Sequence, residues 1–368
     1  MAPISTPALS TRLAERTLEL VDVASESGAE RDIAEHVLGV LRAGGVDARD
    51  GGDTCVLAGA LHRRKRPLVL LAGHLDTVPA QDNWPGRIDG EHVVGLGASD
   101  MKGGVAVMLE LALARAADAS TAPAGASAAL DVGYVLFGRE ELPSAQAALA
   151  PLLERESSLR DADLAIVLEP TDNVVHAGCL GNIDATWTFT GRAGHSARPW
   201  LADSAIDRAL AGIGELHAHA VERETIEGLE FAQVATATTL HAGVARNVIP
   251  GTCTANVNFR YSPRLSTEQA EHDLRARCER HGELELLSNS PGARPPRGNA
   301  LYERLLSCSA RPAQAKQAWT PVAELAAAGI EAVNCGPGDP AHAHSRDERV
   351  ASHALARSYE LLSAFLDG

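Results

Sequence analysis

The sequence has little of what several protein classes require. Its six cysteines are scattered, with no Cys-x-x-Cys pair and no His at zinc-finger spacing, which is typical of reduced thiols in a cytosolic protein. Lys and Arg number 33 against 48 Asp and Glu, and this net charge of −15 argues against a surface for nucleic acid or anionic membrane. No apolar run approaches the roughly 20 residues that a membrane span needs.

The first 20 residues also lack the continuous apolar stretch of a signal peptide. We therefore expect a soluble, cytoplasmic protein with no nucleic-acid or membrane partner. With 368 residues and 45% hydrophobic content, the chain can bury more than one core, and we expect two domains.

The stretch 68–104 organises the rest of the sequence. An apolar run ends in Gly73-His74-Leu75-Asp76, as a buried parallel strand does when it delivers polar side chains to its carboxyl end. His74 and Asp76 are two apart and should point the same way, so the carboxylate could fix one ring nitrogen while the other binds a metal. A glycine-rich turn with Asp100 at its centre then precedes a helical pattern. Either piece alone is more often a core His or an ordinary turn; together they favour a site.

Two further predicted strands also end in acidic residues. Residues 130–137 lead to Glu140-Glu141, and 163–168 lead to Glu169. Adjacent glutamates cannot both point into the core, so one could bind metal while the other works as a base, although paired glutamates are also common on surfaces. Strands that end in His or acid follow the pattern by which open α/β sheets build their sites.

Helices are predicted at 9–23, from about 31 to Gly44-Gly45 and at 103–116, with an exposed connection at 117–128. Ser27 and Glu30 have the spacing of a capping box before the second helix. Between 181 and 289 the order becomes strand, helix, two strands, helix, strand, which is the ferredoxin-like order. The predicted ranges of that region are 183–190, 204–222, 231–241, 248–261, 267–282 and 284–287.

The candidate ligands form a mixed nitrogen and oxygen set that suits Zn²⁺ and, less selectively, Co²⁺ or Mn²⁺. Five ligands exceed the needs of one tetrahedral ion, so if Asp100 bridges, two ions could lie roughly 3.5 to 4 Å apart and hold a hydroxide between them. Glu140 would be free to take the proton of that water and pass it to a leaving amine. The ligands are His74, Asp100, Glu141, Glu169 and His344.

Seven segments, in order along essentially the whole chain, resemble the zinc aminoacylase and carboxypeptidase family. That family includes succinyl-diaminopimelate desuccinylases, acetylornithine deacetylases and carboxypeptidase G. The segments are Gly73-His74-Leu75-Asp76, Gly97-Ala98-Ser99-Asp100-Met101-Lys102-Gly103-Gly104, Glu140-Glu141, Glu169-Pro170, Gly194-His195-Ser196-Ala197, Arg246-Asn247-Val248-Ile249-Pro250 and Ala343-His344-Ser345-Arg346-Asp347-Glu348.

The resemblance implies an α/β fold. A zinc-peptidase-like catalytic domain, with a mixed central sheet flanked by helices, would comprise 1–181 and 291–368. A ferredoxin-like (βαββαβ) lid and dimerisation domain would be inserted at 182–290. The family also implies a homodimer and two Zn²⁺ per subunit.

The resemblance further assigns roles to single residues. His74 and Glu169 would hold one ion, Glu141 and His344 the other, with Asp100 bridging, Asp76 orienting His74 and Glu140 as general base. His195 would reach into a dimer partner's site and stabilise the oxyanion. The candidates for substrate contact are Asn247, Arg260, Arg198 and Thr320.

Within the family, the segments around Cys179, His195, Trp319 and Cys335 look most similar to the succinyl-diaminopimelate desuccinylases of actinobacteria. Two departures concern substrate choice. Pro321 stands where those enzymes usually have Asp, and Cys179-Leu180 stands where some have Arg.

We therefore expect a metal-dependent amidohydrolase that removes succinyl from N-succinyl-LL-2,6-diaminopimelate, in lysine and diaminopimelate biosynthesis. A deacylase or small-peptide carboxypeptidase for another N-acyl amino acid is the alternative among enzymes. A non-catalytic binding paralogue is a third candidate, which would have no chemical reason to keep five ligands and Glu140.

Overall fold

The computed structural model describes residues 6–121, 129–218 and 221–368, which form two compact units. The first comprises 1–177, 295–314 and 324–368, and the second 178–294 with 315–323. The second unit contains more residues than the predicted insertion at 182–290, because 178–181, 291–294 and 315–323 also belong to it.

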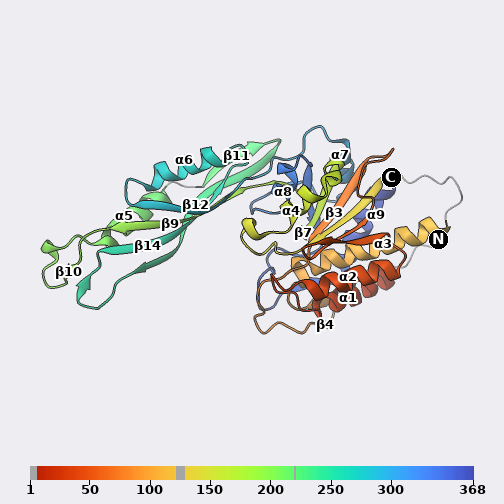
Figure 1. Ribbon diagram of the computed structural model, residues 1–368, viewed down its shortest axis with the longest axis horizontal. Helices are drawn as coiled ribbons and strands as arrows, with labels where there is room; N and C mark the ends of the chain where they lie inside the picture. The colour runs from red at the N-terminus through yellow and green to blue at the C-terminus, as the bar shows by residue number, and fades with distance from the viewer. Residues whose placement is uncertain (1–5, 122–128, 219–220) are drawn as a thin grey trace. The chain divides into compact units, whose positions relative to one another are not determined.

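The first unit is built on a mixed eight-stranded sheet (Figure 1), as the resemblance implied. Its centre is parallel: β3 lies between β6 and β7, and β17 pairs with β7. The outer pairs whose direction is defined are antiparallel. In spatial order the strands are β1 (Ala48–Gly52), β2 (Cys55–Gly59), β6 (Asp131–Phe137), β3 (Leu68–His74), β7 (Leu164–Pro170), β17 (Ala332–Gly336), β8 (His176–Cys179) and β16 (Gln314–Lys316).

Every residue of β3 and β7 is buried, as expected for parallel strands covered on both faces. Helix α3 packs on the central strands and against α1, α2 and α9 (Figure 1). The helices of this unit are α1 (Thr6–Val21), α2 (Arg31–Ala43), α3 (Gly103–Thr121), α4 (Leu149–Arg155), α7 (Ala300–Cys308) and α9 (Ser352–Asp367), and α8 (Val322–Ala327) crosses the unit boundary.

Glycine lets α3 begin directly against the carboxyl end of β7. A Cβ on Gly104 would lie 2.5 Å from the Leu168 carbonyl oxygen, and one on Gly103 would lie 2.7 Å from that of Ala98. Because neither distance is tolerable for a carbon atom, only glycine permits this approach. The turn that precedes α3 therefore holds Asp100 close to Glu169, which is on β7.

A three-stranded antiparallel sheet in the same unit contains β18, which follows the His344 segment. Side chains from residues 81–83 hold that segment: Gln81 donates to the His344 carbonyl and Asn83 to that of Ser345. The strands are β4 (Arg87–Asp89), β5 (His92–Val94) and β18 (Arg349–Ala351).

The second unit is a five-stranded antiparallel sheet in the order β11-β12-β14-β9-β15. Both of its helices contact the sheet on the face where β9 and β14 present alternate apolar residues, and Trp187 and Phe259 lie in that core. The elements are β9 (Gly181–Thr190), β10 (Gly194–His195), α5 (Ala205–Ala218), β11 (Glu222–Ile226), β12 (Leu229–Ala242), β13 (Val248–Ile249), β14 (Thr252–Tyr261), α6 (Thr267–Cys278) and β15 (Glu283–Ser290).

Some local predictions were wrong. Residues 117–121 continue α3 instead of starting an exposed connection, and the predicted connection at 122–128 lies outside the described residues. The predicted helix at 204–222 ends at Ala218, residues 219 and 220 lie outside the description, and Glu222 begins a strand, β11, that the sequence analysis missed. Strand 248–261 is divided into β13 and β14.

The capping box is also absent. Ser27 donates its hydroxyl to Asp76, 49 residues away, and Glu30 precedes α2 without a side-chain cap. Because α2 begins at Arg31, with Glu30 as its N-cap residue, Ser27 lies too early in the chain to cap it.

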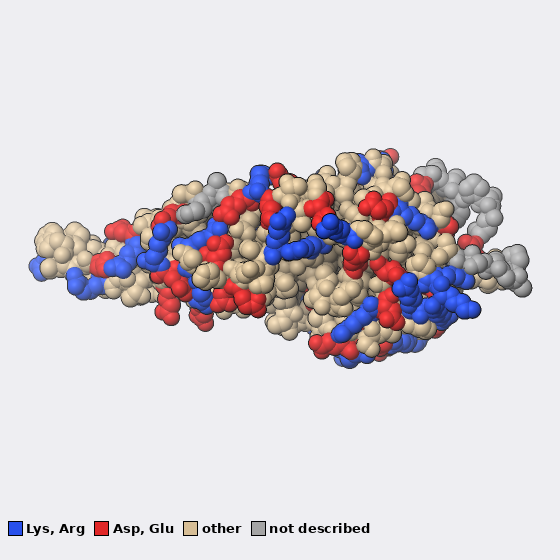
Figure 2. Space-filling model, turned by 90° about the horizontal axis from the view of Figure 1, so that it is seen from above, with Lys and Arg blue, Asp and Glu red and all other residues tan. Residues whose placement is uncertain are grey.

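All six cysteines are free thiols. On the face that Figure 2 shows, acidic and basic side chains are interspersed. Within the described part of the chain, no helix is both long and apolar enough to cross a membrane.

Candidate metal centre

Three neighbouring parallel strands deliver the predicted residues to one edge of the first unit's sheet. His74 is the last residue of β3, Glu169 lies near the end of β7, and Glu140 and Glu141 follow β6. This arrangement follows directly from the buried strands that the sequence predicted.

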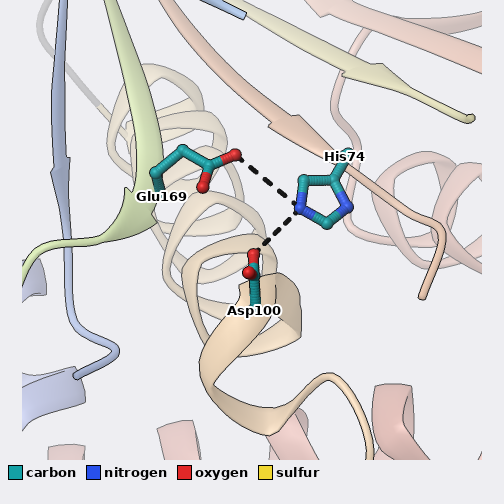
Figure 3. A group of neighbouring side chains, drawn as sticks. All are labelled: His74, Asp100 and Glu169. Atoms are coloured by element: carbon teal, nitrogen blue, oxygen red, sulfur yellow. Dashed lines mark hydrogen bonds and ion pairs between the residues drawn. The ribbon is translucent and has the colours of Figure 1, made fainter. Parts of the chain in front are cut away.

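His74 faces two carboxylates with one nitrogen (Figure 3). Its Nε2 lies 3.1 Å from Asp100 Oδ1 and 3.7 Å from Glu169 Oε1. Its Nδ1 lies 3.0 Å from the carbonyl oxygen of Asp76, which can only accept, so Nδ1 carries a proton. The lone pair of a neutral ring would point from Nε2 at two negative oxygens, so a second proton or a cation must stand there.

Asp100 joins this group to a second one. While its Oδ1 faces His74, its Oδ2 lies 3.5 Å from Nε2 of His344, and that nitrogen is 2.8 Å from Glu141 Oε1. The two groups, His74–Asp100–Glu169 and Asp100–Glu141–His344, each place their ligand atoms within 4.8 Å of one another. A carboxylate with one oxygen toward each group is the geometry that a bridging ligand requires.

The pKa values reflect this crowding of charge. Burial would lower the pKa of His74, but its hydrogen bonds to Asp100 and Asp76 outweigh burial and raise it well above the ordinary value. Hydrogen bonds to Asp100 and Glu141 raise the pKa of His344 to about 10. Burial, and then the charge of Glu169, raise the pKa of Glu140. Protons thus neutralise a cluster that a bound dication would neutralise instead.

The residues therefore fit a metal centre. Two imidazoles and three carboxylates converge, the nitrogens that face the carboxylates are the ones a metal would use, and a mixed nitrogen and oxygen set suits Zn²⁺ better than Ca²⁺ or Mg²⁺. Glu140 also lies within 4.8 Å of ligand atoms of His74 and Glu141, so distance alone does not separate the two glutamates.

Asp76 differs in detail from the expectation. Because β3 ends at His74, Asp76 lies beyond the strand; its carbonyl is the closer partner of the ring, and its carboxylate Oδ1 is 3.5 Å from Nδ1. The fully buried carboxylate also accepts the backbone N–H groups of Glu140 and Glu141, both at 3.0 Å. Asp76 therefore fixes the turn that presents both glutamates as well as the His74 ring.

Two supports of that turn were not predicted from the sequence. Buried Glu30 accepts the backbone N–H of Arg139, and the Arg139 guanidinium forms a two-pronged ion pair with Asp53. Arg139 has a left-handed backbone, with φ of 58°. No spacing rule could identify these partners, because they lie 86 and 109 residues from Arg139.

The remaining candidates belong to the second unit. Three of them lie together: exposed His195 pairs with Val248 in the β10-β13 sheet, and its carbonyl accepts the backbone N–H of Arg198. The backbone N–H of the next residue, Ser196, donates to the carbonyl of Asn247. Arg260 is partly buried near the far end of β14, where its Nε donates to Asn258 Oδ1 at 2.9 Å. Thr320 is buried beside the Cys179 thiol. The His195 region lies near the start of β14 and Arg260 near its end. At about 3.4 Å per residue, the strand between them spans roughly 25 Å.

Comparison with known proteins identifies the family. Residues 70–368 match the sequence model of peptidase family M20/M25/M40. The chain belongs to this family. This M20 membership confirms the resemblance drawn from the sequence and the expectation of a metal-dependent hydrolase.

Relatives of this M20 chain extend over nearly its whole length. A Mycobacterium tuberculosis protein assigned the name succinyl-diaminopimelate desuccinylase DapE is 35% identical over 359 residues, 96% of this chain and 98% of that protein. A succinyl-diaminopimelate desuccinylase of Corynebacterium glutamicum is 32% identical over 358 residues, 95% of each chain. The M20 family metallo-carboxypeptidase Sso-CP2 from Sulfolobus solfataricus shares the fold, with a TM-score of 0.79 at 16% identity over 96% of this chain and 98% of that one.

Metal binding by this M20 chain should release protons. A ligating imidazole must be neutral, whereas the pKa of His344 is raised to about 10 and that of His74 is raised as well, which favours the protonated rings when no metal is bound. Apparent zinc affinity should therefore rise with pH through the neutral range and fall as acid competes. Titration calorimetry at pH 7.5, in two buffers of different ionisation enthalpy, should show about two protons released when both positions fill.

The control compares two histidines. His344→Ala should reduce the count by about one proton, while replacing exposed His353 should leave it unchanged. Zinc binding with no proton release would contradict the protonated state of the cluster.

Proposed function

We propose that the protein is a dinuclear zinc amidohydrolase that removes the succinyl group from N-succinyl-LL-2,6-diaminopimelate, giving succinate and the free diamine. The observation that carries the proposal is the sharing of Asp100 between two ligand groups, one oxygen toward each imidazole. His74 and Glu169 would hold one ion, and Glu141 and His344 the other. When bound, zinc would polarise the amide carbonyl and make the attacking water more acidic.

Glu140 is the proposed general base. Its carboxylate would take a proton from the attacking water and then deliver it to the nitrogen of the leaving amine. The backbone N–H bonds from Glu140 and Glu141 to Asp76 fix the turn for this task, so the adjacent side chains can serve different purposes. Glu141 contacts His344 at 2.8 Å, which favours Glu141 as the ligand and Glu140 as the base.

The succinyl substrate is proposed from the names of relatives together with one basic residue. The proteins of Mycobacterium tuberculosis and Corynebacterium glutamicum that align with nearly the whole chain carry the desuccinylase name. A succinyl carboxylate needs a cationic or hydrogen-bonding partner when it leaves water, and Arg260 is the proposed one, with Asn247, Arg198 and Thr320 as further contacts. Pro321 and Cys179-Leu180 favour the alternative, a deacylase for another N-acyl amino acid, because they remove polar groups expected of a desuccinylase.

The second unit is proposed to be the dimerisation domain. Its strand and helix order is ferredoxin-like with β11 added, and an edge strand of such a sheet can pair with its two-fold mate. Large apolar side chains are exposed on this unit, among them Trp200 at 74% and Val244 at 89%. His195 lies on the separate β10-β13 pair, near the start of β14, whereas Arg260 lies near the end of β14. Their separation supports the proposal that a second copy supplies His195 to stabilise the oxyanion.

Replacing each of the two adjacent glutamates should separate their roles. Glu140→Ala should keep two zinc ions per chain yet lower kcat by about 10²- to 10⁴-fold, because only the proton acceptor is lost. Glu141→Ala should instead lose tight binding of one ion. Elemental analysis after gel filtration, paired with the rate of amine release, distinguishes the two; the opposite pattern would mean that the roles are exchanged.

Substrate preference tests the activity itself. Release of primary amine from a panel of N-acyl amino acids, with zinc present, should be fastest for N-succinyl-LL-2,6-diaminopimelate. Arg260→Ala should lower kcat/KM on succinyl substrates by roughly 10- to 100-fold, as charge-assisted hydrogen bonds of about 1.5 to 3 kcal/mol imply, with less effect on N-acetyl substrates.

Arg264→Ala is the matched control, because Arg264 is an arginine of the same unit that is paired with Glu224. It should leave the preference unchanged. Faster turnover of N-acetylornithine or a dipeptide than of any N-succinyl compound would replace the desuccinylase assignment with the broader deacylase one.

Mixed dimers test the role of the second unit. Subunits with His195→Ala and subunits with Glu140→Ala, each inactive alone, should regain roughly a quarter of wild-type activity when equal amounts exchange, since half of the dimers then contain one complete site. Mixing Glu140→Ala with Glu169→Ala should restore nothing, because both residues belong to the same unit. A fully active monomer in analytical ultracentrifugation would exclude this arrangement.

A further inference from the structure

Glu348 is a buried carboxylate that binds the backbone of the turn bearing Asp100. Its side chain is 1% exposed. Its Oε2 accepts the N–H of Gly97 at 3.0 Å, and its Oε1 accepts those of Ser99 and Asp100 at 3.0 and 2.9 Å. One carboxylate thus accepts three hydrogen bonds from the peptide N–H groups of the turn that sets the direction of the Asp100 side chain.

The same residue connects two of the three segments that supply the second ligand group. Glu348 lies four residues after His344, and its backbone N–H donates to the Ser345 carbonyl while its carbonyl accepts from Gly95. Its side chain holds Asp100, which is 248 residues away in sequence. The relative position of Asp100 and His344 therefore depends on Glu348, although no atom of Glu348 belongs to either ligand group.

A carboxylate is needed here because all three partners are donors. An amide in its place would turn an NH₂ group toward at least one backbone N–H, and that buried donor would lose its acceptor. The negative charge has its own counterpart: Lys102 is 2% exposed, donates its Nζ to the Val23 carbonyl at 2.8 Å and interacts electrostatically with Glu348.

We propose that Glu348 is a positioning residue for the metal centre. It holds Asp100 with one carboxylate oxygen toward each imidazole, and so determines the affinity of the ion that Asp100, Glu141 and His344 would hold. The inference rests on the proposed function, because it takes Asp100 as a ligand of both ions. The ion at His74 and Glu169 depends on it less, since β3 and β7 fix those two ligands independently of the turn.

Glu348→Gln tests this proposal, since it keeps the size of the side chain and removes one acceptor oxygen. The purified apo variant would be titrated with Co²⁺, followed by visible absorption, and with Zn²⁺, followed by calorimetry. The affinity for the first equivalent should change little, and the second should bind about 10- to 100-fold more weakly, the usual cost of losing a residue that supports a ligand. Excess metal should restore much of the lost activity.

Glu110→Gln is the matched control. Glu110 is another buried carboxylate of the first unit, on α3, but its partners are Arg12 and Arg16. This variant should lower the thermal midpoint of the apo protein and leave both metal affinities unchanged. If Glu348 has a purely structural role, Glu348→Gln should likewise lower the thermal midpoint and leave both metal affinities unchanged. Wild-type affinities for both ions in that variant would overturn the proposal.

Two further outcomes are decisive. If Glu348→Gln does not fold, Glu348→Asp takes its place: it keeps the charge but withdraws the carboxylate from the turn, so the second affinity should still fall, and an unchanged affinity would overturn the proposal. If the wild-type protein itself binds no second ion, the dinuclear centre and this inference fail together. A failure confined to the variants would leave the proposed function standing.

Discussion

The candidate metal centre depends on the placement of one carboxylate between two imidazoles. Asp100 directs one oxygen at His74 and the other at His344, and Glu169 and Glu141 add negative charge on either side. Such a cluster is unfavourable without positive charge, since burial weakens the solvation of each carboxylate. Protons on the histidines satisfy it in part, and two metal ions would satisfy it more fully, so the site's electrostatics and its proposed chemistry have the same origin.

Three buried carboxylates that are not themselves proposed ligands hold the turns that carry the ligands. Asp76 accepts the backbone N–H groups of Glu140 and Glu141, Glu30 that of Arg139, and Glu348 those of the turn around Asp100. Each is at most 1% exposed. Hydrogen bonds from backbone N–H groups to an ionised carboxylate are roughly twice as strong as those between neutral groups, so they can hold a turn where no regular secondary structure does.

The division into two units separates two kinds of requirement. The ligand groups need rigid strand ends, which a parallel sheet covered by helices supplies. Contacts to a substrate that must enter and leave can come from exposed positions such as His195 and Asn247 on the second unit.

The sequence by itself predicted which side chains follow the central strands, because three apolar runs lead to His74, to Glu140-Glu141 and to Glu169, and together they follow the pattern of buried parallel strands that deliver polar side chains to one edge of a sheet. It also determined the family. Only the tertiary structure decided that Ser27 binds Asp76 instead of capping α2, that Arg139 pairs with Asp53, and that Glu348 supports Asp100. These contacts join residues 49 to 248 positions apart, and local spacing holds no information on partners that meet only when the sheet has assembled.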